Sequence, residues 1–206
     1  MFALIDDQQI TKFFSGNKGV TIGDVQYPKS IFTLWSEAER NAIGIYEVTI
    51  DTTNKKDEAY YINTNVSYGV ESNKAVGSFG TATAKAHADT LWTQQDSDDG
   101  DLPSDKSVGD VKVEGLKTIK IREVKKQAAN ILSETDWYIT RKSDAGTAVP
   151  SAITTHRAAV RTKAAEQETA ITNAADTPAL ETLYTYTEQE DGSVTRPLGN
   201  LPILDS

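Results

Sequence analysis

Two stretches of helical periodicity, joined by an irregular connection, constrain the fold of this chain more than any other feature. Within residues 114–134, apolar side chains recur every three or four positions, at Ile121, Val124, Ala128, Ile131 and Leu132. Residues 153–176 continue the pattern with Ile153, Val160, Ala164 and Ile171. Since each apolar stripe needs a partner, the two segments predict a helical hairpin.

The connection between these helices is about sixteen residues long, which exceeds most helix-to-helix loops. It therefore needs side chains that hold it in place. Trp137 and Tyr138 are expected to cover the open end of the two apolar stripes. Pro150 precedes Ser151, which is a suitable N-cap for the second helix.

Arg157 lies on the apolar stripe of the second helix, four residues after Ile153 and three before Val160. A buried guanidinium without an acceptor is costly. Asp136, just beyond the first helix, is the expected acceptor. A bidentate pair between Arg157 and Asp136 would join the two helices at their turn.

The residues around this turn also follow an ordered motif. Leu-x-x-Thr-Asp-Trp is followed by a variable loop with a proline, and then by His-Arg-x-x-x-Arg on a helix. Over residues 130–165 the chain resembles the phage tail assembly chaperone family, related in role to tail fibre assembly proteins. The matching positions are Leu132, Thr135, Asp136, Trp137, Pro150, His156, Arg157 and Arg161. The family typically has tyrosine in place of His156 and ends sooner after the second arginine.

This resemblance implies an assembly protein that binds a phage tail or tail-fibre protein in the host cytoplasm and shields its exposed apolar surface. The eight matching residues, with Tyr138 and Val160, are the expected partner-binding or hairpin-locking positions. Residues 30–48 also look like stretches near the start of tail-fibre-associated proteins. The alternative is a permanent virion component, such as a tail-fibre or tail-tip subunit, and a homo-oligomer fits either function.

Residues 1–92 predict a β-rich domain. Short strands are expected at 2–6, 8–14 and 45–52, and a longer one within 58–70, arranged as an antiparallel meander. A short helix interrupts them, because Ser36 and Glu39 have the spacing of a capping box.

Residues 93–107 gather aspartate, glycine, serine and proline and predict an acidic linker. A calcium-binding loop is the alternative for these aspartates, but it needs glycine at its sixth position and glutamate at its twelfth. Counted from Asp96, those positions are Asp101 and Ser107. The pattern excludes such a loop, and no metal site is expected.

The expected organisation is therefore α+β. The β-rich domain (1–92) and the acidic linker (93–107) precede a helical hairpin domain (108–184). Residues 185–206 are expected to form a short β-hairpin, turning at Asp191 and Gly192, and an extended tail.

The net charge of −9 disfavours nucleic acid and anionic membranes as partners. Residues 108–163 carry eleven basic and six acidic side chains, but no aromatic residues alternate with the basic ones as in nucleic-acid sites. No apolar run reaches the roughly 18 residues of a membrane helix. The N-terminal residues also lack the basic region of a secretory signal, so a cytoplasmic protein is expected.

Catalytic chemistry is not expected. The chain has no cysteine and two histidines, and the glycine-x-serine-x-glycine elbow of serine hydrolases is missing. SGNKGVT (15–21) has its glycines too close together for a nucleotide phosphate loop, so a surface turn is the better prediction. Neither a catalytic residue nor a cofactor is predicted. A carbohydrate-binding module based on Trp35, Trp92 and the tyrosines is a third hypothesis, although strand aromatics are more often core residues.

Overall fold

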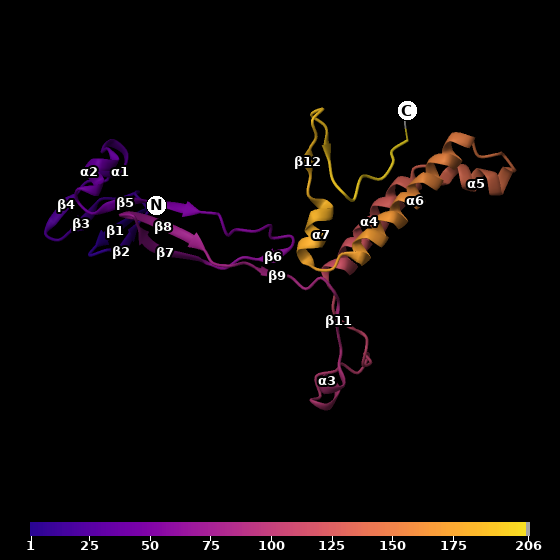
Figure 1. The fold of residues 1–206 in the computed structure, drawn as a ribbon, viewed down its shortest axis with the longest axis horizontal. Helices are drawn as coiled ribbons and strands as arrows, with labels where there is room; N and C mark the ends of the chain where they lie inside the picture. Colours follow the sequence, from indigo (N-terminus) through magenta and orange to yellow (C-terminus); the bar gives the residue numbers. More distant parts are fainter. Residues whose placement is uncertain (205–206) are drawn as a thin grey trace. The chain divides into compact units, whose positions relative to one another are not determined.

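The computed structural model describes residues 1–204, which form the predicted α+β fold with 36% helix and 24% strand. The chain divides into two compact units, residues 1–83 and residues 84 onward. Strands dominate the first unit, and the long helices belong to the second (Figure 1).

The first unit contains strands β1 (Phe2–Asp6), β2 (Gln9–Phe14), β3 (Val20–Ile22), β4 (Val25–Tyr27), β5 (Ile45–Asp51), β6 (Tyr61–Ile62), β7 (Val66–Glu71), β8 (Lys74–Phe79) and β9 (Thr83–Ala84). Its helices are α1 (Ile31–Leu34) and α2 (Glu37–Asn41). Five strands form one sheet in the order β2-β1-β5-β8-β7, while β3 pairs with β4 and β6 with β9. The expected capping box is confirmed, since Ser36 and Glu39 bond reciprocally at the start of α2.

The pairing of β5 with β8 is parallel, whereas the other pairs of this sheet are antiparallel. The predicted antiparallel meander is therefore wrong at this pair, because parallel neighbours require a crossover. The predicted strand within 58–70 is also divided, into β6 and β7. A tight turn joins β7 to β8, with Ser72 and Asn73 both at positive φ.

One face of the sheet carries the main hydrophobic core of this unit. Its buried members are Phe14, Val20, Ile31, Phe32 and Ile45. Tilted ring contacts join Phe32 to Phe2 at 4.8 Å and to Phe14 at 6.2 Å between centroids. The core therefore fixes β2 against α1 and the β3–β4 hairpin.

The opposite face includes small buried residues, and the sheet curls on this side. The strand register places Ala3, Ala75 and Gly77 on this face, and both alanines are fully buried. The edge strands β2 and β7 approach each other there, with the rings of Phe13 and Tyr68 5.0 Å apart. A Cβ built on Gly77 would lie 2.7 Å from Cε1 of Tyr68, so this glycine permits the curl.

The second unit contains helices α3 (Gln94–Asp98), α4 (Leu116–Ser133), α5 (Asp136–Ala145), α6 (Ser151–Asn173) and α7 (Thr177–Tyr184). Its strands form two antiparallel pairs, β10 (Thr90–Leu91) with β11 (Val111–Val113) and β12 (Thr187–Glu188) with β13 (Val194–Thr195). The β12–β13 pair, with Gly192 at positive φ in its turn, confirms the predicted C-terminal hairpin.

Residues 84–92 belong to the helical unit, whereas the sequence analysis assigned them to the β-rich domain. Asp89 caps α4: Oδ1 accepts from the backbone N–H of Gly115 at 2.7 Å, and Oδ2 from the hydroxyl of Thr118 at 2.8 Å. Thr177 also donates to the carbonyl of Lys85 at 2.7 Å. These contacts span many residues in sequence, so a local pattern does not reveal them.

The predicted linker 93–107 contains a short helix. Thr93 and Asp96 form a capping box that starts α3. Asp96 also pairs with Lys112, whose ammonium lies over the Trp92 ring. Because β10 and β11 pair on either side of this segment, it is an ordered loop of the second unit whose two ends lie together.

Helices α4 and α6 run antiparallel, which confirms the predicted hairpin (Figure 1). A hydrogen bond joins Lys117 to the carbonyl of Thr172, and an ion pair joins Lys125 to Glu168. The later residue of α4 thus contacts the earlier residue of α6, as antiparallel helices require. The buried side chains of α6 are Ile153, His156, Arg157, Val160, Ala164, Gln167 and Ile171. The connection predicted as a sixteen-residue loop instead contains α5, which ends at Gly146 with φ +68°.

Replacing Gly77 by alanine should destabilise the first unit by about 1–2 kcal/mol, because the new Cβ would meet Tyr68, Ile50 and Val66 together, each at under 3 Å. Gly69, in β7, is the matched control because a Cβ there meets nothing within 4 Å. Hydrogen exchange of β7–β8 peptides measures both variants. Equal protection of these peptides in the two variants would show that the curl does not depend on the absence of a side chain at Gly77.

The Lys112 ammonium, followed by the Thr93 hydroxyl and N–H, lowers the pKa of Asp96 from 3.8 to about 2. Because the folded pKa is depressed, this contribution to stability is present above the unfolded pKa and is lost as pH falls through about 2. Lys112→Met should raise the pKa of Asp96 toward 3.8, measured by NMR titration of its carboxyl carbon. Lys106→Met is the control, and an unchanged pKa in Lys112→Met would exclude the pairing.

Candidate functional site

The guanidinium of Arg157 joins the end of α4 to the start of α5. Its Nη1 donates to the carbonyl of Leu132 at 2.6 Å and to the hydroxyl of Thr135 at 2.7 Å. Its Nη2 lies 2.8 Å from Oδ1 of Asp136. These four residues are called the Arg157 cluster below. The pairing predicted between Arg157 and Asp136 is confirmed, but it is not bidentate, because Nη1 is committed to the other two acceptors.

The sequence places these acceptors for a physical reason. The Leu132 carbonyl is in the last turn of α4, where it accepts from the Thr135 N–H at 3.2 Å and can take a further donor, and a cation there is favoured by the helix dipole. Asp136 is the first residue of α5, where a carboxylate is favoured in the same way. Arg157 is only 7% exposed, so its polar contacts replace water that it has lost.

The three contacts of Arg157 differ in strength. The Asp136 side chain is 60% exposed, so solvent screens its charge from the guanidinium. Thr135 is buried, and its hydroxyl also donates to the Leu132 carbonyl at 3.1 Å. The bonds to Leu132 and Thr135 are therefore expected to contribute more to the hairpin than the ion pair does.

Helix α5 carries a stack of three side chains, called the tip stack below. The rings of Trp137 and Tyr138 are 3.7 Å apart between centroids. The guanidinium of Arg141 lies 4.8 Å from the Trp137 centroid and 5.3 Å from that of Tyr138. Trp137 remains 51% exposed. Trp137 and Tyr138 were expected to cover the open end of the apolar stripes; about half of the Trp137 surface faces solvent instead, whereas Tyr138 is half-buried.

The remaining predicted residues lie along α6 and at its start. Val160 is fully buried and His156 nearly so, both on the face toward α4. Pro150 is the exposed N-cap of α6, in place of the predicted Ser151. Arg161 is exposed and donates to the Arg157 carbonyl at 3.4 Å. The structure thus unites Leu132, Thr135 and Asp136 around Arg157 and leaves Pro150 and Arg161 outside the cluster.

Sequence reasoning missed Arg141 and Gln167. Arg141 follows Trp137 by four residues, the spacing of neighbours on a helix, and would have been found had residues 136–145 been predicted as helical. Gln167 lies on the buried face of α6 and donates to the carbonyls of Leu198 and Gly199 at 3.4 and 3.1 Å. It therefore attaches the C-terminal tail, which no local pattern indicates.

Across residues 1–204, no helix is both long and apolar enough to cross a membrane. In the same residues, no three His, Asp or Glu side chains gather in a way that could hold a metal ion.

No protein-family model, curated protein or solved structure matches this chain. The family resemblance described above therefore depends on the motif between Leu132 and Arg161 alone.

Replacing Arg157 by alanine should destabilise the second unit by about 2–4 kcal/mol, because the Leu132 carbonyl and the Thr135 hydroxyl lose their buried donor. Asp136→Ala should cost less, about 0.5–1 kcal/mol, because the carboxylate is solvated. Urea denaturation of both single variants and the double variant gives the coupling energy. Arg161→Ala, four residues further along α6, is the control, and zero coupling would show that the ion pair contributes nothing.

Proposed function

We propose that this chain is a non-enzymatic assembly protein of a tailed phage. It binds a tail or tail-fibre protein in the host cytoplasm through the α4–α6 hairpin and covers apolar surface on the immature partner. It stays bound in the virion tail if the mature partner does not bury that apolar surface itself. A self-associated form of the chain would present several copies of the hairpin.

One observation carries this proposal: Trp137, a large aromatic side chain, is half exposed on a short helix whose start is fixed by the buried Arg157. Exposed aromatics with an adjacent arginine are typical of the residues that dominate protein–protein binding. Because the Arg157 cluster already fixes the start of α5, binding through the tip stack would cost little further conformational entropy. Ile139, 45% exposed on the same helix, adds apolar surface.

The family motif supports the same location. Leu132, Thr135, Asp136 and Arg157 belong to the motif and meet in one cluster, so its spacing has a structural reason. Trp137 belongs to the motif as well, yet about half of its surface faces solvent. A function in binding accounts for its presence.

A permanent virion component is the second candidate. Unit 1 also exposes apolar side chains, among them Phe13, Ile50 and Tyr68 on one face of its sheet, and permanent interfaces are large and apolar. Mass spectrometry of purified particles separates the two functions: stoichiometric presence favours the component, and absence favours a released chaperone.

Co-expression with the tail or fibre protein encoded beside this chain tests the proposal. We expect a stable complex by size exclusion with light scattering, and a partner that is soluble only when this chain is present. Trp137→Ala should weaken the complex at least about tenfold, as expected for a central aromatic contact, with an unchanged urea midpoint.

Tyr186→Ala is the matched control, because Tyr186 is an exposed aromatic that also lies beside an arginine, Arg196, but outside the hairpin. Equal losses of affinity in the two variants would show that the tip stack is not the binding surface. A partner that folds alone and forms no complex would contradict the assembly function.

A further inference from the structure

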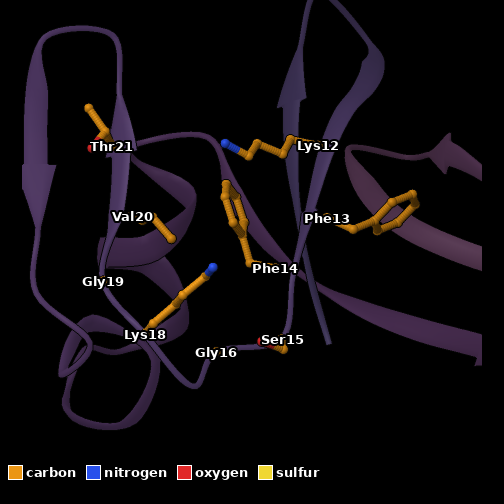
Figure 2. A pocket seen from close by; sticks show the side chains of 9 residues that line it. All are labelled: Lys12, Phe13, Phe14, Ser15, Gly16, Lys18, Gly19, Val20 and Thr21. Carbon is orange, nitrogen blue, oxygen red and sulfur yellow. The ribbon is translucent and has the colours of Figure 1, made fainter.

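The first unit contains a hollow of about 430 Å³ between β2, β3 and the loop that joins them. Its floor is the ring of Phe14 with Val20, both buried in the main core of that unit. Figure 2 shows the side chain of Lys12, on β2, and that of Lys18, on the loop after β2, on either side of Phe14. The ammonium of Lys12 lies 5.5 Å from the centre of the Phe14 ring.

The charge of this hollow is opposite to that of the unit around it. Residues 1–83 carry ten acidic and seven basic side chains. None of the residues that line the hollow is acidic. Among the described residues neither Lys12 nor Lys18 forms an ion pair, although other lysines of the chain do. The hollow therefore holds two cations without a counter-charge from the protein.

The walls of the hollow are held by packing. Gly16 takes φ +76°, and a Cβ there would lie 3.1 Å from the Phe2 ring. At Gly19 the backbone approaches the carbonyl of Tyr27 so closely that a Cβ would lie 2.7 Å from it. The loop that carries Lys18 is thus pressed against the core and the β3–β4 hairpin, and the position of Lys18 opposite Lys12 follows from the fold.

We propose that this hollow binds an organic anion, with a carboxylate or phosphate between the Lys12 and Lys18 ammonium groups and an apolar ring or chain against Phe14 and Val20. Two ammonium donors match the oxygens of such an anion, and the aromatic floor matches its apolar body. The hollow is open to solvent, so the expected Kd is on the order of millimolar. This inference is independent of the proposed function, because it concerns the first unit alone.

Titration of the full chain, followed by amide NMR shifts, tests the proposal. The probes are benzoate and phenyl phosphate, which distinguish a carboxylate from a phosphate, and benzamide, an uncharged analogue of benzoate. We expect saturable shifts at residues 12–21 with at least one anion, and binding of benzamide at least about tenfold weaker.

Lys12→Gln and Lys18→Gln should each weaken binding about threefold to tenfold, and the double variant should abolish it. Both lysines are exposed, so these variants are expected to fold. Lys74→Gln, an exposed lysine of the same unit outside the hollow, should bind as the unchanged chain does. Saturable binding by neither anion, equal binding of benzamide, or undiminished binding in the double variant would overturn the proposal.

Discussion

A guanidinium placed between two helices must receive acceptors there, and the second unit is arranged around this requirement. Arg157 can be buried because α4 ends at Ser133 and α5 begins at Asp136, so that a carbonyl of the last turn, a hydroxyl and a carboxylate face it together. The same contacts set the turn between the helices and the direction in which α5 starts. A neutral side chain at 157 would remove the buried donor that these acceptors share and weaken the turn.

Within ten residues of sequence, this arrangement places side chains that stabilise the hairpin beside those of the proposed binding surface. The buried members of the motif hold the hairpin, whereas Trp137, Tyr138 and Arg141 of α5 stack on one another, with Trp137 half exposed. The proposed assembly function uses the outer set. The first unit shows a similar division, since Phe14 and Val20 belong to its core while Lys12 and Lys18, beside them in sequence, face the hollow.

Much of the fold was predictable because its signals are local. The helical stripes of α4 and α6, the Ser36–Glu39 capping box and the Asp191–Gly192 turn each depend on residues a few positions apart. The errors arose where distant residues compete with local preference. The acidic composition of 93–107 suggested a linker, but a capping box at Thr93 and the ion pair of Asp96 with Lys112 order that segment.

The sequence by itself determined that a buried Arg157 would need an acceptor, for which Asp136 was the expected residue, because the helical spacing and the cost of an unpaired charge are independent of the rest of the fold. Only the tertiary structure decided which other acceptors Arg157 uses, that Trp137 is half exposed, and that Lys12 and Lys18 line one hollow with Phe14. Each of these outcomes depends on where separate elements lie in space. The parallel pairing of β5 with β8 has the same origin, because strand periodicity is identical in parallel and antiparallel neighbours.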